Sequence, residues 1–106
     1  MGKNQRTKGA NFERDVAKLI QSYGWQARRG QVFNHEPDII TDMPIHVEAK
    51  RQETTKIHEW FAQSKSACGD KIPTVVHKRS RDDILITLRF EDFMKLLRGD
   101  ADGSGK

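Results

Sequence analysis

The sequence has a single cysteine, three prolines and no long apolar run. Because Cys68 stands alone, an intrachain disulfide and a zinc site built from cysteines are both excluded. No stretch approaches the ~20 consecutive apolar residues that a membrane-spanning helix needs, so we expect no membrane contact and a cytoplasmic location. Hydrophobic residues make up only 35% of the 106 positions, which predicts one modest core in a single small domain.

Charge is plentiful and slightly positive. Lysine and arginine number 19 against 15 aspartate and glutamate, a net charge of +4 that is compatible with a polyanionic partner without requiring one. Residues 1–8, which carry Lys3, Arg6 and Lys8, are predicted to be a flexible basic arm. Residues 99–106, "GDADGSGK", are predicted to be a disordered tail, which leaves residues 9–98 as the folded domain.

Hydrophobic periodicity predicts the order of the elements. A helix is expected at about residues 10–23 and a second one after Thr54 or Thr55, either of which can cap it. The other expected elements are strands at about 25–29, 38–41, 45–51, 73–79 and 83–90, and a closing helix at 91–98. This α-β-β-β-α-β-β-α order predicts an α/β fold with a mixed sheet flanked by helices. The strands at either end of the middle helix should be parallel and the earlier ones antiparallel.

The stretch "PDIITDMPIHVEAK", residues 37–50, carries the chemistry. Alternation along its second strand separates two sets of side chains, Ile45, Val47 and Ala49 on one face and His46, Glu48 and Lys50 on the other. The short turn between the strands can bring Asp38 close to Glu48. Two neighbouring carboxylates repel unless a cation lies between them, and Mg²⁺ is commonly held by one or two carboxylates with waters completing its shell. Lys50 could stabilise charge on a phosphate or hold an attacking water.

A simpler interpretation must be weighed against this one. A triplet of acid, any residue and lysine is expected about once by chance in a chain of this composition. Glu48 and Lys50 could also form a surface ion pair that contributes under ~1 kcal/mol. The context favours the metal site, because Pro37-Asp38, a short turn and an alternating strand follow a helix that carries Glu13 as a candidate third acid.

Two segments resemble a known superfamily. Pro37-Asp38, nine further residues and then Glu48-Ala49-Lys50 match the PD-(D/E)XK nuclease motif. "GANFERDVAKLIQSYGW", residues 9–25, resembles the first helix of Holliday junction resolvases of the archaeal type and their phage-borne relatives. The resemblance extends over residues 9–97 and implies a restriction-endonuclease-like fold. The host would be a bacterial or archaeal cell, or a cell infected by a phage.

The resemblance also implies roles for particular residues. Asp38, Glu48 and the Ala49 carbonyl would bind Mg²⁺, with Mn²⁺ as a substitute, and Glu13 would complete the site, often through water. Lys50 would orient or activate a water, and Gln52 would support it. The implied reaction is hydrolysis of DNA phosphodiester bonds that leaves a 5′-phosphate. Resolvases of this kind are homodimers that place paired nicks across a four-way junction.

Other substrates and roles stay open at this point. The short chain leaves little room to read a base sequence, which favours a structure-selective nuclease, but flaps, nicked duplex or DNA ends are alternatives to a junction. A non-catalytic module that binds branched DNA is a further alternative, disfavoured because Asp38, Glu48 and Lys50 are all present. None of the four histidines has a metal-ligand partner at helical spacing, so surface or packing roles are expected. The predicted DNA contacts, each of which could instead be ordinary solvated charge or polarity, are Lys8, Arg14, Arg28, Arg29, Gln31, Arg51, Gln52, Lys78, Arg79 and Arg81.

Overall fold

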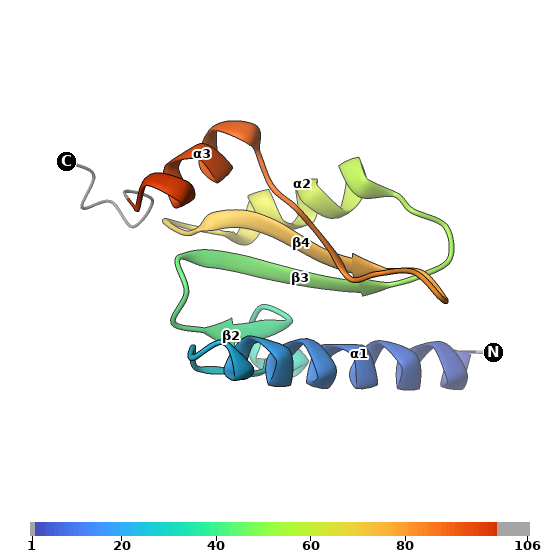
Figure 1. The fold of residues 1–106 in the computed structure, drawn as a ribbon. Coiled ribbons are helices and arrows are strands. Elements are labelled where there is room, and N and C mark those ends of the chain that lie inside the picture. The colour runs from blue at the N-terminus through green and yellow to red at the C-terminus, as the bar shows by residue number, and fades with distance from the viewer. Residues whose placement is uncertain (1, 100–106) are drawn as a thin grey trace.

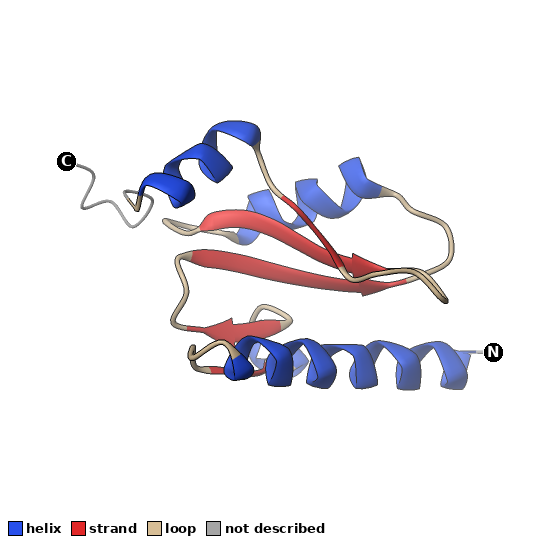
Figure 2. Cartoon of the chain, in the orientation of Figure 1, coloured by secondary structure: helices blue, strands red, loops and turns tan. Residues whose placement is uncertain are grey.

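The computed structural model describes residues 2–99, so all of the predicted tail at residues 99–106 except Gly99, the C-cap of the last helix, lies outside the described part of the chain. The α-β-β-β-α-β-β-α order is confirmed, with one added 3₁₀ turn (Figures 1 and 2). In chain order the elements are α1 (Gly2–Ser22), β1 (Ala27–Arg29), η1 (Val32–Asn34), β2 (Ile39–Thr41), β3 (Ile45–Arg51), α2 (Ile57–Ala67), β4 (Ile72–Lys78), β5 (Leu85–Thr87) and α3 (Phe90–Arg98). No helix among the described residues is long and apolar enough to cross a bilayer.

The strands form one five-stranded mixed sheet in the order β1-β2-β3-β4-β5. β2 is antiparallel to both of its neighbours, β1 and β3, while β3 and β4 are parallel and β5 is antiparallel to β4. The parallel pair is joined through α2, as predicted for a strand-helix-strand crossover. β2 and β3 share a single registered pair, Ile39 opposite Val47, so these two strands diverge soon after they meet.

Helices cover both faces of the sheet. Phe12 and Val16 of α1 are buried in one cluster with Val47 of β3 and Val76 of β4. The next residue of β4, His77, points to the opposite face and makes a tilted ring contact with Trp60 of α2, with centroids 5.9 Å apart. α1 therefore packs on one face, mainly against β1 and β3, and α2 packs on the other, against β3 and β4.

Three boundaries differ from the sequence-based predictions. α1 begins at Gly2 and not near residue 10, so it includes the backbone of residues 2–8; these residues contain good helix formers and no proline, which makes it easy to extend an existing helix. The predicted threonine cap of α2 is wrong, because Lys56 occupies the N-cap position without a side-chain cap. Packing of the buried Trp60 accounts better for where this helix forms. β5 spans only Leu85–Thr87, shorter than the predicted strand.

Candidate active site

Asp38 and Glu48 meet where β2 and β3 diverge. The register that pairs Ile39 with Val47 places the residue before Ile39 directly across from the residue after Val47, so Asp38 faces Glu48. The Oδ2 atom of Asp38 accepts a hydrogen bond from the Ala49 backbone N–H at 2.9 Å, which fixes the carboxylate against β3. The prediction that the short turn brings these two acids together is confirmed.

The surroundings of this pair make it costly for Glu48 to lose its proton. The Glu48 side chain is only 16% exposed. Burial is the largest cause that raises the pKa of Glu48 to about 7; the charge of Asp38 and a hydrogen bond between the two carboxyl groups raise it further, while Lys50 opposes the rise. Without a cation Glu48 therefore holds its proton up to about neutral pH, since a second negative charge beside Asp38 is costly.

Glu13 reaches the same place from α1. Its Oε1 atom accepts a hydrogen bond from Arg29 Nε at 2.6 Å. Burial raises the pKa of Glu13 more than the hydrogen bond from Arg29 lowers it, and the charge of Asp38 adds to the rise. Arg29, predicted as a DNA contact, is thus engaged in the structure by holding Glu13.

Lys50 follows Glu48 on the same face of β3, because side chains two apart on a strand share a face. Its positive charge lowers the pKa of both Glu48 and Glu13, so the ammonium lies within electrostatic reach of both acids. We refer to Glu13, Asp38, Glu48 and Lys50 as the fork site, after the divergence of β2 and β3. The structure brings together all four residues that the sequence predicts to be catalytic.

Gly30 fixes the backbone around Pro37 and Asp38, a role that the sequence did not predict. Its N–H donates to the Asp38 carbonyl at 2.8 Å. A Cβ atom added to Gly30 would lie only 1.8 Å from the Pro37 carbonyl oxygen, so no larger residue fits without moving the backbone. The loop between them is further tied by the Gln31 N–H, which donates to Glu36 at 2.8 Å. A glycine at the start of this loop was the one sequence feature that could have indicated such a close backbone contact.

The oxygen donors of the fork site suit a hard divalent cation. Asp38 and Glu48 lie close enough for the charge of Asp38 to raise the pKa of Glu48, so a cation between them would be favourable. Mg²⁺ is bound in proteins by one or two carboxylates together with waters. Within residues 2–99, no group of three His, Cys, Asp or Glu side chains could enclose an ion. This geometry fits a two-carboxylate site, with Glu13 acting at longer range.

His46 is a neighbour of this site whose importance the sequence did not reveal. The side chain is buried, and its Nε2 atom lies 3.5 Å from a carboxylate oxygen of Glu48. Nε2 has no hydrogen-bond partner among the described residues. Burial is the largest cause that lowers the pKa of His46, and the charge of Asp38 opposes it. Strand alternation placed it on the face of Glu48, but gave no sign of its burial.

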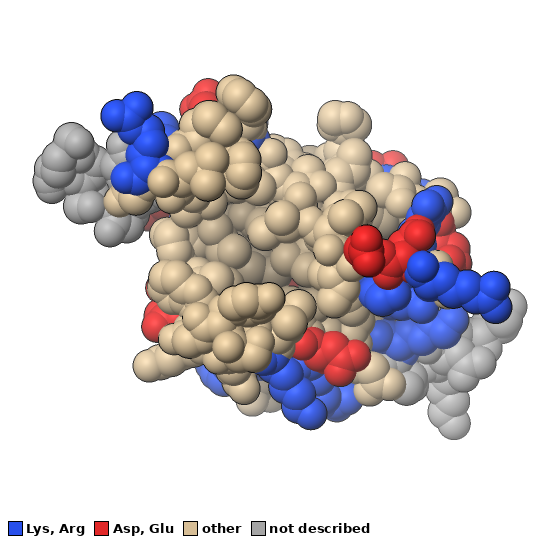
Figure 3. All heavy atoms as spheres, in the orientation of Figure 1, with Lys and Arg blue, Asp and Glu red and all other residues tan. Residues whose placement is uncertain are grey.

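Most of the predicted DNA contacts lie on the surface, and several are engaged within the chain. Arg28 pairs with Glu36 at 3.3 Å, Arg51 with Glu53 at 2.8 Å and Arg79 with Asp82 at 2.8 Å. Arg14 donates to Asn11 at 3.0 Å. Figure 3 shows Lys and Arg side chains gathered mainly at the end of the molecule where β3 and β4 end, mixed with acidic ones. Of the remaining predicted contacts, Lys78 is partly buried. The others are exposed: Lys8, Gln31, Gln52 and Arg81.

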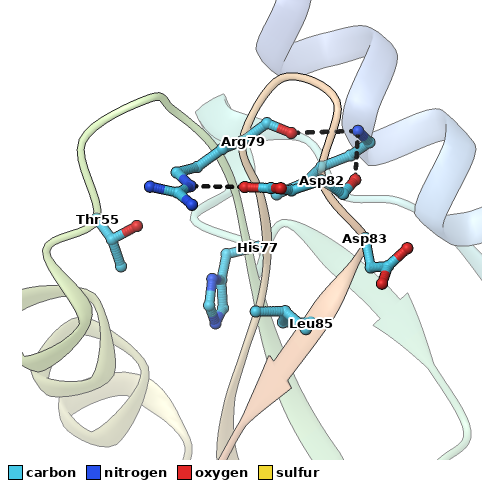
Figure 4. Close-up of a pocket in the computed structure, with 7 residues that line it drawn as sticks. Thr55, His77, Arg79, Asp82, Asp83 and Leu85 are labelled. Carbon is cyan, nitrogen blue, oxygen red and sulfur yellow. Dashed lines mark hydrogen bonds and ion pairs between the residues drawn. The ribbon is translucent and has the colours of Figure 1, made fainter.

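A cavity of about 360 Å³ lies at this end of the sheet. Figure 4 shows His77 and Leu85 along it, with Thr55 to one side and the bonded pair Arg79 and Asp82 above. Lys78 and Asp83 complete its lining. His77 is registered with Lys50 on the neighbouring strand, so the cavity begins next to the fork site.

The order of elements and the arrangement of Asp38, Glu48 and Lys50 are those of a PD-(D/E)XK nuclease. The family described as "Phage putative PDDEXK endonuclease" matches residues 4–102. This match covers nearly the whole chain, and the protein therefore belongs to this family of phage endonucleases. Neither the curated proteins nor the solved structures contain a significant match to the chain. Nucleases of the PD-(D/E)XK type typically use a divalent metal, which agrees with the oxygen donors of the fork site.

Proposed function

We propose that this protein is a Mg²⁺-dependent, structure-selective DNA endonuclease that resolves four-way junctions as a homodimer. The observation that carries the proposal is the pairing of Asp38 and Glu48 across the fork, with Lys50 on the same strand face. A divalent cation, when bound, would supply positive charge to a phosphate oxygen and lower the pKa of a water. Mn²⁺ should substitute for Mg²⁺.

The residues of the chain would divide the remaining work. Asp38 and Glu48 would hold the cation, with the Ala49 carbonyl as a further oxygen donor. Lys50 would position the attacking water and stabilise negative charge that develops on the phosphate. Arg29 would keep the Glu13 carboxylate turned toward the fork through its 2.6 Å hydrogen bond. Glu13 would then orient waters around the cation.

The preference for DNA shape over base sequence is supported by the connections between elements. The turn between β2 and β3 comprises only residues 42–44, and the loop between β3 and α2 only residues 52–56. Reading bases in the major groove requires a projecting helix or strand pair that presents several side chains to base edges. The basic side chains at this end, with Lys78 and Arg79 lining the cavity, suit phosphate contacts, which carry no sequence information.

A cleavage assay tests the proposal directly. A labelled four-way junction, a linear duplex and a flap of matching sequence would be incubated with Mg²⁺. Asp38→Asn and a chelator serve as negative controls, and Asp70→Asn, which changes an exposed acid on another surface, serves as a matched positive control. Paired nicks in the junction alone, lost in both negative controls, are expected. Equal cutting of duplex or flap would retain the nuclease and reject junction selectivity, whereas tight binding without cutting would indicate a binding module.

A further inference from the structure

α3 turns its apolar stripe away from the protein. Phe90, Phe93, Met94 and Leu97 follow i, i+3, i+4, i+7 spacing, so they lie along one side of the helix. Phe90 is 77% exposed and Leu97 is 67% exposed, while the other two are exposed to a lesser degree. Leu96, on a different side, packs with Leu88 against the core. We call the four stripe residues the α3 face. In the view of Figure 3, uncharged side chains cover the front of the α3 region, and charged ones lie at its edges.

We infer that the α3 face is the contact between two copies of this chain, paired antiparallel about a two-fold axis. This inference deepens the homodimer of the proposed function by naming its surface. Resolving a junction needs two nicks, and a two-fold dimer supplies two equivalent active sites.

The segment that follows α3 in the printed sequence does not supply an apolar cover for this face. Residues 100–106, which follow α3, contain one alanine and otherwise only glycine, serine, lysine and aspartate. A segment of this composition has no large apolar side chain to bury. The polyanionic backbone of DNA is also a poor occupant, since it is bound by cationic and hydrogen-bonding groups. A partner with an apolar surface of similar shape is required, and a second copy provides one.

The area agrees with a dimer. Given their exposed fractions, the four side chains present roughly 500 Å² per copy, so a two-fold contact removes about 1,000 Å² from water, the lower limit for a specific interface. Leu85 and Ile86 of the edge strand β5 are also more than half exposed and precede α3 in the chain. Any contribution from them would bring the contact closer to a standard interface.

Charge on α3 selects the antiparallel arrangement. The first turn carries the acids Glu91 and Asp92, and the last turn carries the bases Lys95 and Arg98. Asp92 is buried and paired with Arg89 at 2.9 Å, which leaves Glu91 as the exposed acid. In an antiparallel pair, Glu91 of one copy lies beside the basic last turn of the other, whereas a parallel pair would bring like charges together. The apolar side chains then match Phe90 with Leu97 and Phe93 with Met94.

The mass of the protein in solution, without DNA or metal and across a concentration series, tests this inference by sedimentation equilibrium. The wild-type chain is expected to be a dimer, and Phe90→Asp is expected to be a monomer with an unchanged circular dichroism spectrum. Phe33→Asp is the matched control, because Phe33 is 79% exposed but lies outside the α3 face, and it should remain dimeric. Leu97→Asp repeats the test should Phe90→Asp fail to fold. A wild-type chain that stays monomeric, or stripe variants that stay dimeric, would overturn the inference.

A charge exchange tests the orientation of the pair. Glu91→Lys and Arg98→Glu are each expected to weaken dimerisation several-fold, and the double variant should restore it. A double variant no better than the worse single variant would overturn the antiparallel arrangement. Failure here is separable from failure of the nuclease proposal: a dimer without Mg²⁺-dependent cleavage rejects only the nuclease, and a cleaving wild-type monomer rejects only the dimer.

Discussion

α1 and α3 are both amphipathic, but they place their apolar side chains in opposite environments. Phe12 and Val16 of α1 are 5% and 2% exposed against the sheet, while Phe90 and Leu97 of α3 remain mostly exposed. Burying one large apolar side chain stabilises a protein by about 1.5–3 kcal/mol. α1 obtains this stabilisation within its own chain, whereas the exposed side chains of α3 do not. The fold therefore buries the apolar side of the helix next to the fork site, and the proposed contact with a second copy would bury the apolar side of α3.

The largest expected effect is the loss of cleavage when residues of the fork site are replaced. Asp38→Asn and Glu48→Gln should each reduce the cleavage rate at least about 10³-fold, because each removes a carboxylate charge at the cation site while junction binding persists. Lys50→Ala should lose most of the rate with metal affinity largely kept. Single-turnover cleavage and a gel-shift titration measure the two properties. Loss of binding in all three folded variants would contradict these roles.

The second effect concerns the backbone beneath Asp38. Gly30→Ala should lower the free energy of unfolding by about 2–4 kcal/mol and reduce cleavage, because the new methyl group collides with the Pro37 carbonyl. Gly9→Ala is the control, since a Cβ atom there meets nothing within 4 Å and alanine favours the helix. Urea titrations of both variants provide the measurement. Equal stabilities would show that the loop adapts freely.

The third prediction compares the two helices directly. Val16→Ala should destabilise the chain by about 2 kcal/mol at every protein concentration, because it leaves a cavity under α1. Leu97→Ala should have little effect in dilute solution and a growing effect as concentration rises, since its burial depends on a second copy. Thermal unfolding over a concentration series distinguishes them. A concentration-independent loss for Leu97→Ala would place that side chain in the core of the single chain.

The fourth effect is a dependence of stability on pH that arises from Glu48 in the fork site. The pKa of Glu48 is about 7 in the folded protein against an ordinary value of 4.5, so the folded state binds more protons between these values. Stability in the absence of metal should therefore fall as pH rises from 4.5 to 7, and the full penalty is present above 7. Glu48→Gln should be more stable than wild type by roughly 1–3 kcal/mol at alkaline pH.

Unfolding curves of both proteins at acidic and alkaline pH measure this difference. The gap between wild type and Glu48→Gln should close below pH 4.5, where Glu48 is protonated in both the folded and the unfolded state. Mg²⁺ should stabilise the wild type more than the variant at alkaline pH, because an ion that binds only the folded state shifts the equilibrium. A gap that is independent of pH would contradict the raised pKa of Glu48.

The smallest expected effect is on DNA affinity. Arg79→Ala should weaken junction binding up to about tenfold and reduce the salt dependence by about one unit, as for one lost phosphate contact. The structural reason is its place beside the cavity near Lys50. Lys65→Ala, in the last turn of α2, is the matched control for removing a positive charge. A gel-shift titration over several salt concentrations checks both variants, and equal slopes would remove Arg79 from the DNA-binding surface.

The sequence predicted the fold and the pairing of Asp38 with Glu48 because those features depend on local patterns. Strand alternation set the two faces of β3, and the short turn set the register. The partner of Arg29 was not predictable, since Glu13 lies sixteen residues earlier on another element. The contact between Gly30 and Pro37 likewise arises only when the loop closes.

The exposure of one side of α3 could not be predicted from its apolar spacing either. An apolar stripe at helical spacing shows that a helix must bury one side, and it does not show in which molecule the burial occurs. Three-dimensional exposure was needed to separate Leu96, which packs inward, from Leu97, which does not. The prediction of a threonine cap for α2 was wrong for a related reason, because tertiary packing of Trp60 outweighed the local preference for threonine at the N-cap.

The edge strand β5 has a consequence for how the protein behaves when it is concentrated. Residues 84–88, "ILITL", form an uncharged run of strong strand formers on an unpaired sheet edge, which is the composition that promotes cross-β aggregation. Asp82 and Asp83 precede this run and Arg89 follows it, so charges stand at both ends as gatekeepers. Neutralising these three residues would remove the barrier that keeps one β5 edge from adding to another, and fibrils would then compete with native protein.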